Sequence, residues 1–168
     1  MPESIENYVI RERRHHPLVA KALLPYFSGW NPIRCRVIIR PEEWWFFRAG
    51  CDGACCMWGT VSFVEGWMNK PAGISSRSHV PCDLSQPSNW RCLIHETYHA
   101  FQCARDGHSY MTARYAHAVG ASMLKSRKLF DHAVIPFERE CSRETAKIIE
   151  GLRKAKPASF WQTFEKLQ

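Results

Sequence analysis

The chain has 168 residues, of which 45% are hydrophobic, and a formal net charge of +7. A chain of this length buries about two-thirds of its unfolded surface, and its composition excludes a disordered or low-complexity protein. No apolar run approaches the roughly 18 residues that span a bilayer, and the polar, acidic start Met1–Asn7 does not resemble a secretory signal. We therefore expect one domain over residues 1–168, in a cytoplasmic protein with no membrane partner.

Residues 1–87 predict short helices and a small sheet. The expected elements are helical segments at residues 4–16 and 17–27 and strands at Arg34–Arg40, Trp58–Val64 and Gly73–Val80. The strands are rich in β-branched and aromatic residues, and Pro17 separates the two helical segments. Gly50, Asp52 and Gly53 indicate a loop between the first two strands.

Residues 95–99 read His-Glu-Thr-Tyr-His, which is the most informative motif of the chain. A helix of about 18 residues is expected around it, with Ser88 as N-cap and a stop at Gly107. On a helix, positions i and i+4 share a face, so His95 and His99 can bind the same metal ion. Glu96 directly follows the first histidine, where its carboxylate can act as general base on a water.

The downstream part of the chain predicts two further long helices, one at residues 109–127 and one that opens at Pro136. The apolar stripe of the second is formed by Phe137, Cys141, Ile148, Ile149 and Leu152, with Thr145 as its one polar member. Glu138 falls on this buried stripe, whereas Glu140 aligns with Glu144 and Lys147 on the solvated side. Periodicity therefore selects Glu138 as the inward carboxylate and the third protein ligand that a zinc hydrolase site requires.

The end of the chain predicts a short amphipathic turn after Pro157. It contains Phe160, Trp161 and Phe164.

The HExxH motif, followed some 40 residues later by a helix that opens Pro-Phe-Glu-x-Glu-Cys, resembles the gluzincin metallopeptidases. It is similar to small bacterial zincin-like domains that carry Glu-x-Glu-Ala-Asp on the second helix. The resemblance covers about residues 88–150 and implies one zinc ion per chain, bound by His95, His99 and Glu138, with Glu96 catalytic. It also implies that a strand near the motif helix binds an extended peptide, and Trp58–Val64 and Gly73–Val80 are the two candidates.

The chain departs from that signature at Cys141-Ser142, which stands where the signature has Ala-Asp. Because the Asp orients a ligand histidine in such sites, another group must do so here. Ser142, Asp106 and Asp131 are the alternatives. A donor for the developing oxyanion is also expected. Five side chains between the ligand helices are chemically able, namely His108, Tyr110, Tyr115, His117 and His132, and none is assigned as catalytic.

Eight cysteines are many for this length. They are Cys35, Cys51, Cys55, Cys56, Cys82, Cys92, Cys103 and Cys141. An even count suits disulfides in a secreted protein, whereas the absence of a signal favours reduced thiols in the cytoplasm, which is the interpretation we adopt. A second, structural zinc site on Cys51, Cys55, Cys56 and Cys82 is disfavoured by their irregular spacing.

The positive charge supplies the rival hypotheses. Basic clusters lie at residues 11–16, 125–128 and 153–156, but no nucleic-acid-binding motif accompanies them, so a nucleic-acid partner is not favoured. The sequence therefore predicts an α+β, zincin-like fold, in which a small sheet in residues 1–87 packs on the HExxH helix of the helical, metal-binding residues 88–168. The expected activity is zinc-dependent hydrolysis of a protein or peptide. The alternatives are a basic, cysteine-rich metal- or nucleic-acid-binding protein and an inactive zincin-like interaction module.

Overall fold

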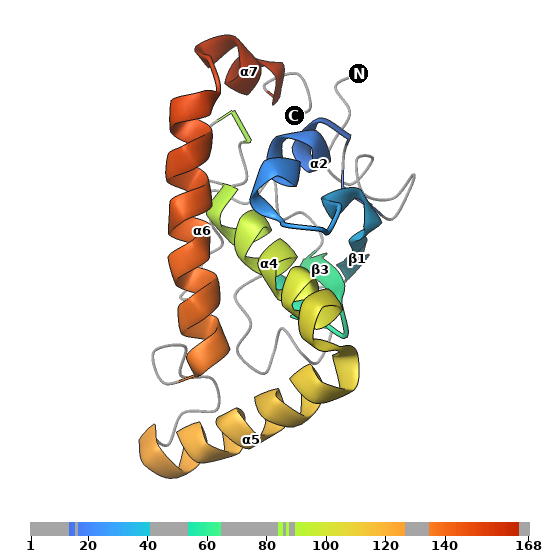
Figure 1. Cartoon of the computed structure of the whole chain (residues 1–168), viewed down its shortest axis with the longest axis vertical. Coiled ribbons are helices and arrows are strands. Elements are labelled where there is room, and N and C mark those ends of the chain that lie inside the picture. The colour runs from blue at the N-terminus through green and yellow to red at the C-terminus, as the bar shows by residue number, and fades with distance from the viewer. Residues whose placement is uncertain are drawn as a thin grey trace.

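The computed structural model describes residues 14–15, 17–40, 54–64, 84–85, 87, 90–126 and 135–164. In these ranges the chain is mixed α+β, mostly helical with one small sheet. Helix α4 crosses the middle of the molecule, α6 stands along one side of it, and α5 lies across one end, away from α7 (Figure 1). Within the described part, no helix combines the length and the apolar character needed to cross a bilayer.

The sheet has three strands in the order β1-β3-β2. Strands β1 (Arg36–Arg40) and β3 (Thr60–Val64) are parallel, with Val37 opposite Val61. Strand β2 (Ala54–Met57) is antiparallel to β3. The strands predicted at Arg34–Arg40 and Trp58–Val64 are therefore confirmed with later starts.

Strand β2 was predicted as part of a loop, which was wrong. It pairs with β3 through a two-residue turn in which Trp58 (φ 49°) and Gly59 (φ 71°) both have positive φ. Positive φ at both central residues is the type I′ geometry that matches the twist of a hairpin. The turn carries Trp-Gly in place of the usual Asn-Gly, so its sequence gave no hairpin signal.

Two of the predicted long helices supply the frame of the candidate site. Helix α4 spans Trp90–Asp106 and ends at Gly107, whose φ of 90° and N–H···O=C bond to Cys103 (3.0 Å) form the expected C-terminal stop. Helix α6 spans Pro136–Ala155 and begins with proline, as predicted. The third long helix, α5 (His108–Ser126), follows α4 directly.

Shorter elements complete the described part. They are α2 (Pro17–Leu23), the 3-10 turns η1 (Leu24–Tyr26) and η2 (Pro32–Arg34), and α7 (Ala158–Gln162). The predicted helix at residues 4–16 lies mostly outside the described residues. At its end the prediction was wrong, because Arg14 forms an isolated antiparallel bridge with Arg36. The strand predicted at Gly73–Val80 and the N-cap at Ser88 lie outside the described residues.

The main core lies between the sheet, α2, α4 and α6. Its largest buried members include Phe27, Phe63, Trp90, Leu93 and Phe164. The indole of Trp90 packs edge-on against Phe164 and donates its N–H to the carbonyl of Leu84 (2.8 Å), so the polar edge of this buried ring is satisfied. Helix α4 is thus fixed at its first residue, and its register sets where His95 and His99 point.

Candidate metal centre

Helices α4 and α6 bring three predicted ligand atoms together. The Nε2 atoms of His95 and His99 are 3.1 Å apart, and Oε2 of Glu138 lies 3.1 Å from the first and 3.2 Å from the second. Zinc holds N and O ligands at about 2.0–2.2 Å in a tetrahedron, which places ligand atoms roughly 3.3 Å from one another. The three donors therefore have the spacing that one zinc ion requires.

A fourth donor, Cys141, lies beside them. His95, His99 and Cys141 form a cluster whose ligand atoms all lie within 4.8 Å of one another, and this cluster could hold a metal ion. Cys141 follows Glu138 by one turn of α6 and is fully buried. In the observed arrangement its Sγ donates a hydrogen bond to the backbone carbonyl of His95 (3.1 Å). Sequence periodicity placed Cys141 on the buried face but did not assign it to the site.

The electrostatics of the cluster favour a cation. Glu138 is 3% exposed, and a buried carboxylate is costly unless positive charge compensates it. Although burial lowers the pKa of His95, hydrogen bonds to Cys141 and Glu138 outweigh it and raise that pKa to about 10. The pKa of His99 is likewise raised well above its usual value against the effect of burial, chiefly by negative charge and hydrogen bonding at the Cys141 sulfur and by Glu138. A metal ion at this position would supply the positive charge that the two imidazolium protons supply without it.

Gln102 orients His99, a role for which the sequence suggested other residues. Its Nε2 donates to the carbonyl of Phe137 (3.3 Å) and to the carboxylate of Glu140 (3.1 Å), and both partners can only accept. Its Oε1 must therefore face Nδ1 of His99, at 2.8 Å, and accepts the proton there. With Nδ1 as donor, Nε2 of the neutral His99 ring presents its lone pair to the cluster.

The alternatives predicted for this orienting role are placed differently. Asp106 pairs with Arg105 at 2.7 Å, Ser142 is half-buried on α6, and Asp131 lies outside the described residues. The signal that could have identified Gln102 was its position, since it lies on the same face of α4 as His99, three residues later, where a buried amide requires partners.

Glu140 was predicted on the solvated side of α6, and its side chain is 29% exposed there, but it has partners that the prediction did not foresee. It accepts hydrogen bonds from Tyr98 (3.1 Å), Gln102 and Arg105 (2.8 Å), and these partners lower its pKa, the Arg105 guanidinium most. Glu140 thereby ties α6 to α4 behind the metal centre. Glu138 is inward and buried as predicted.

Glu96 is also buried, at 9% exposure, on the side of α4 that packs on the sheet strand β2. Its negative charge acts on His95, whose pKa it helps to raise, and on the thiol of Cys56 in β2. The carboxylate is therefore near enough to both His95 and Cys56 to act on their charges.

The remaining thiols do not form a second metal centre within the described residues. Cys55 and Cys56 are adjacent in β2, so their side chains point to opposite faces of the sheet, and Cys51 and Cys82 lie outside the described residues. Cys103 is hydrogen-bonded to Cys56, which lowers the pKa of Cys103 to about 6. The six cysteines of the described part form no disulfide.

The residues considered as oxyanion donors are spread over α5. Tyr115 stacks on Phe137 with ring centroids 5.4 Å apart, and His108 lies against Gly59 of the β2–β3 turn. Tyr110 and His117 line a groove of about 330 Å³ between α5 and the start of α6. His132 lies outside the described residues.

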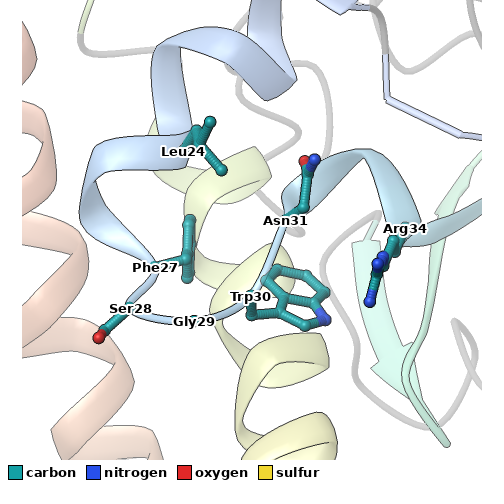
Figure 2. Close-up of a pocket in the computed structure, with 7 residues that line it drawn as sticks. All are labelled: Leu24, Phe27, Ser28, Gly29, Trp30, Asn31 and Arg34. Carbon is teal, nitrogen blue, oxygen red and sulfur yellow. The ribbon is translucent and has the colours of Figure 1, made fainter.

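A second concavity, of about 380 Å³, is formed by the segment that runs from η1 to η2 (Figure 2). It is lined by Leu24, Phe27, Ser28, Gly29, Trp30, Asn31 and Arg34. None of the metal-centre residues contributes to it, so it adds no chemistry to the site.

The chain has no match among protein-family models, curated proteins or solved structures.

Proposed function

We propose that this chain is a zinc-dependent metallopeptidase with a zincin-like fold. The zinc ligands are His95, His99 and Glu138, and Glu96 is the general base. The observation that carries the proposal is the mutual spacing of the three donor atoms, 3.1–3.2 Å, from two helices that are far apart in sequence. Without a metal, burial of this carboxylate must be compensated by protonation of the two imidazoles, whereas a bound cation would compensate it directly.

Zinc, when bound, supplies an activated water and polarises the scissile carbonyl. Glu96 would serve as the general base for that water and would carry its proton to the leaving amine. Gln102 holds the ring of His99, and Glu140 holds Gln102, so that the ligand set is in place before substrate arrives.

The substrate is a peptide bond of a protein or peptide. Strand β3, one of the two strands predicted to bind an extended peptide, cannot do so by strand addition because β1 and β2 pair with both of its edges. The other candidate, Gly73–Val80, lies outside the described residues.

Elemental metal analysis of the purified protein tests the ligand set. We expect about one zinc per chain in the wild type, loss of that zinc in Glu138→Ala, and retention in Glu144→Ala. Glu144 is a matched control on the same helix, where it forms ion pairs with Arg143 and Lys147. A wild type without metal, or zinc that survives Glu138→Ala, would contradict the assignment.

Peptide hydrolysis tests the role of Glu96. Glu96→Gln should keep the zinc and lose roughly 100-fold or more in kcat, because general-base catalysis contributes about that much. Equal activity of the two proteins would remove Glu96 from the mechanism and leave the metal assignment standing.

A second candidate function is a metal-stabilised binding protein. The fourth donor, Cys141, favours it, because zinc sites closed by four protein ligands are structural. Removal of a structural zinc should unfold the chain, whereas removal of a catalytic zinc should abolish activity with modest loss of stability. Circular dichroism of the chelated protein separates the two.

A further inference from the structure

Two helices contribute donors to the candidate centre in pairs. Helix α4 presents His95 and His99, four residues apart, and α6 presents Glu138 and Cys141, three residues apart. Both separations place side chains on one helical face. Glu138 and Cys141 of α6 therefore both lie near the imidazole pair of α4.

The Cys141 thiol has two partners within reach. Its hydrogen bond to the carbonyl of His95 turns it toward the backbone of α4. The same sulfur lies within 4.8 Å of the ligand nitrogens of both histidines, and a tetrahedral zinc with Zn–S of about 2.3 Å places sulfur roughly 3.6 Å from such nitrogens. The sulfur thus lies near both the backbone carbonyl and the two imidazoles.

We propose that Cys141 is an exchangeable fourth ligand that closes the metal centre and holds the enzyme in a latent state. This inference rests on the proposed function. In the closing step the S–H bond breaks, the sulfur–metal bond forms, the water leaves, and the thiol proton is released to solvent. In the opening step a water takes the position of sulfur, and the reprotonated thiol donates to the carbonyl of His95, as observed.

Cys141 is fully buried, so its sulfur can reach only the metal centre of its own chain, and the exchange is intramolecular. The thiol is held next to the centre by its own helix, so closure needs no second molecule and is favoured by its high effective concentration. Peptide hydrolysis requires the fourth position for water. The fraction of chains with sulfur bound therefore sets the fraction that is inactive.

Cobalt(II) substitution tests the sulfur bond directly. The metal-free protein is loaded with Co²⁺, and thiolate-to-cobalt charge-transfer absorption in the near ultraviolet is recorded for the wild type, Cys141→Ala, Cys141→Ser and Cys35→Ala. Cys35 is the control, because it is an equally buried thiol in the core. We expect the band in the wild type and in Cys35→Ala, and its loss in both Cys141 variants. Cys141→Ser retains a donor for the His95 carbonyl, so it guards against a misfolded alanine variant.

Affinity and activity give the second readout. Zinc should dissociate about tenfold or more readily from Cys141→Ser than from the wild type, while peptide hydrolysis by the zinc-loaded variant should rise severalfold. A wild-type cobalt protein without a sulfur band, or a band that survives loss of Cys141, would overturn the latent state and leave the peptidase proposal intact. Failure of the wild type to bind either metal would overturn both.

Discussion

At the scale of single residues, the site depends on groups that hold the ligands as much as on the ligands themselves. The amide of Gln102 is buried, and its three hydrogen bonds join His99, the Phe137 carbonyl and Glu140. Each partner fixes one end of the amide, so Gln102 has one orientation and His99 one tautomer. The direction of the lone pair on Nε2 of a neutral His99 follows from this chain of donors and acceptors.

Replacement of Gln102 tests this positioning role. In Gln102→Leu the shape is nearly kept but His99 loses its acceptor, so we expect zinc affinity to fall about 10- to 100-fold. The dissociation constant is measured by competition with a chelator at a temperature where both proteins are folded. Ser142→Ala is the control, and its affinity should match the wild type. A Gln102→Leu protein with unchanged affinity would show that His99 needs no such partner.

The same residues show where prediction from sequence stops. Helical periodicity was sufficient to predict that Glu138 is buried, because burial follows from the spacing of apolar neighbours on one helix. It could not predict the contacts of Gln102 and Glu140, since these depend on the relative position of α4 and α6 along their axes. The hydrogen bonds that Glu140 accepts from Tyr98, Gln102 and Arg105 join two helices, so its place on one helix did not reveal them.

At the scale of elements, α6 packs closely on the turn η1 through Gly151. A Cβ built at Gly151 would lie 2.7 Å from the hydroxyl oxygen and 2.8 Å from Cε1 of Tyr26. Gly120 in α5 is exposed, and a Cβ built there would meet no atom outside its own stretch of helix within 4 Å. The two helical glycines thus differ in what surrounds them and not in backbone conformation.

We therefore expect opposite effects from the same substitution. Gly120→Ala should raise the free energy of unfolding by about 1 kcal/mol, because alanine favours the helix. Gly151→Ala should lower it by roughly 1–3 kcal/mol, since the clash with Tyr26 exceeds that gain. Urea unfolding measures both. A stabilised Gly151→Ala protein would mean that Tyr26 moves aside at little cost. The effects of Gly151→Ala and Tyr26→Ala on the free energy of unfolding would then be additive.

Elements with a local signal were predictable from the sequence, and those with a non-local origin were not. Helices α4, α5 and α6 carry their own starts, stops and apolar stripes, so their ranges were close to those observed. Strand β2 contains Cys55-Cys56-Met57, which has weak strand character, and it forms because β3 offers it a partner across the Trp58–Gly59 turn. The bridge from Arg14 to Arg36 is also non-local, because strand β1 supplies the partner for Arg14.

At the scale of the whole molecule, segments from both ends of the chain converge on α4. Trp161 and Phe164 pack against Trp90 at the start of α4. His15, from the N-terminal part of the chain, contacts Thr97 in the middle of this helix. His15 and Thr97 are in contact at 2.9 Å although 82 residues separate them. The hydroxyl of Thr97 donates its proton to the carbonyl of Leu93 (2.6 Å), so Nε2 of His15 must be the donor to Thr97.

This contact makes the stability of the fold depend on pH. Burial of His15 lowers its pKa from 6.5 to about 4, and its Nδ1 is buried without a hydrogen-bond partner among the described residues. The unfolded chain binds a proton near pH 6.5 and the folded chain only near pH 4, so the contribution to stability is complete above the first value and is lost as pH falls toward the second. Between pH 7 and pH 5 we expect a loss of roughly 2 kcal/mol from this residue.

Urea unfolding at the two pH values measures that loss. In His15→Gln, where the amide keeps a donor for Thr97 but does not titrate, the difference between pH 7 and pH 5 should shrink by roughly 2 kcal/mol. His117→Gln, a substitution at an exposed position of α5, should leave the difference unchanged. If His15→Gln retained the full wild-type dependence, the acid sensitivity would arise elsewhere, and the N-terminal segment would not be held on α4 by a neutral His15.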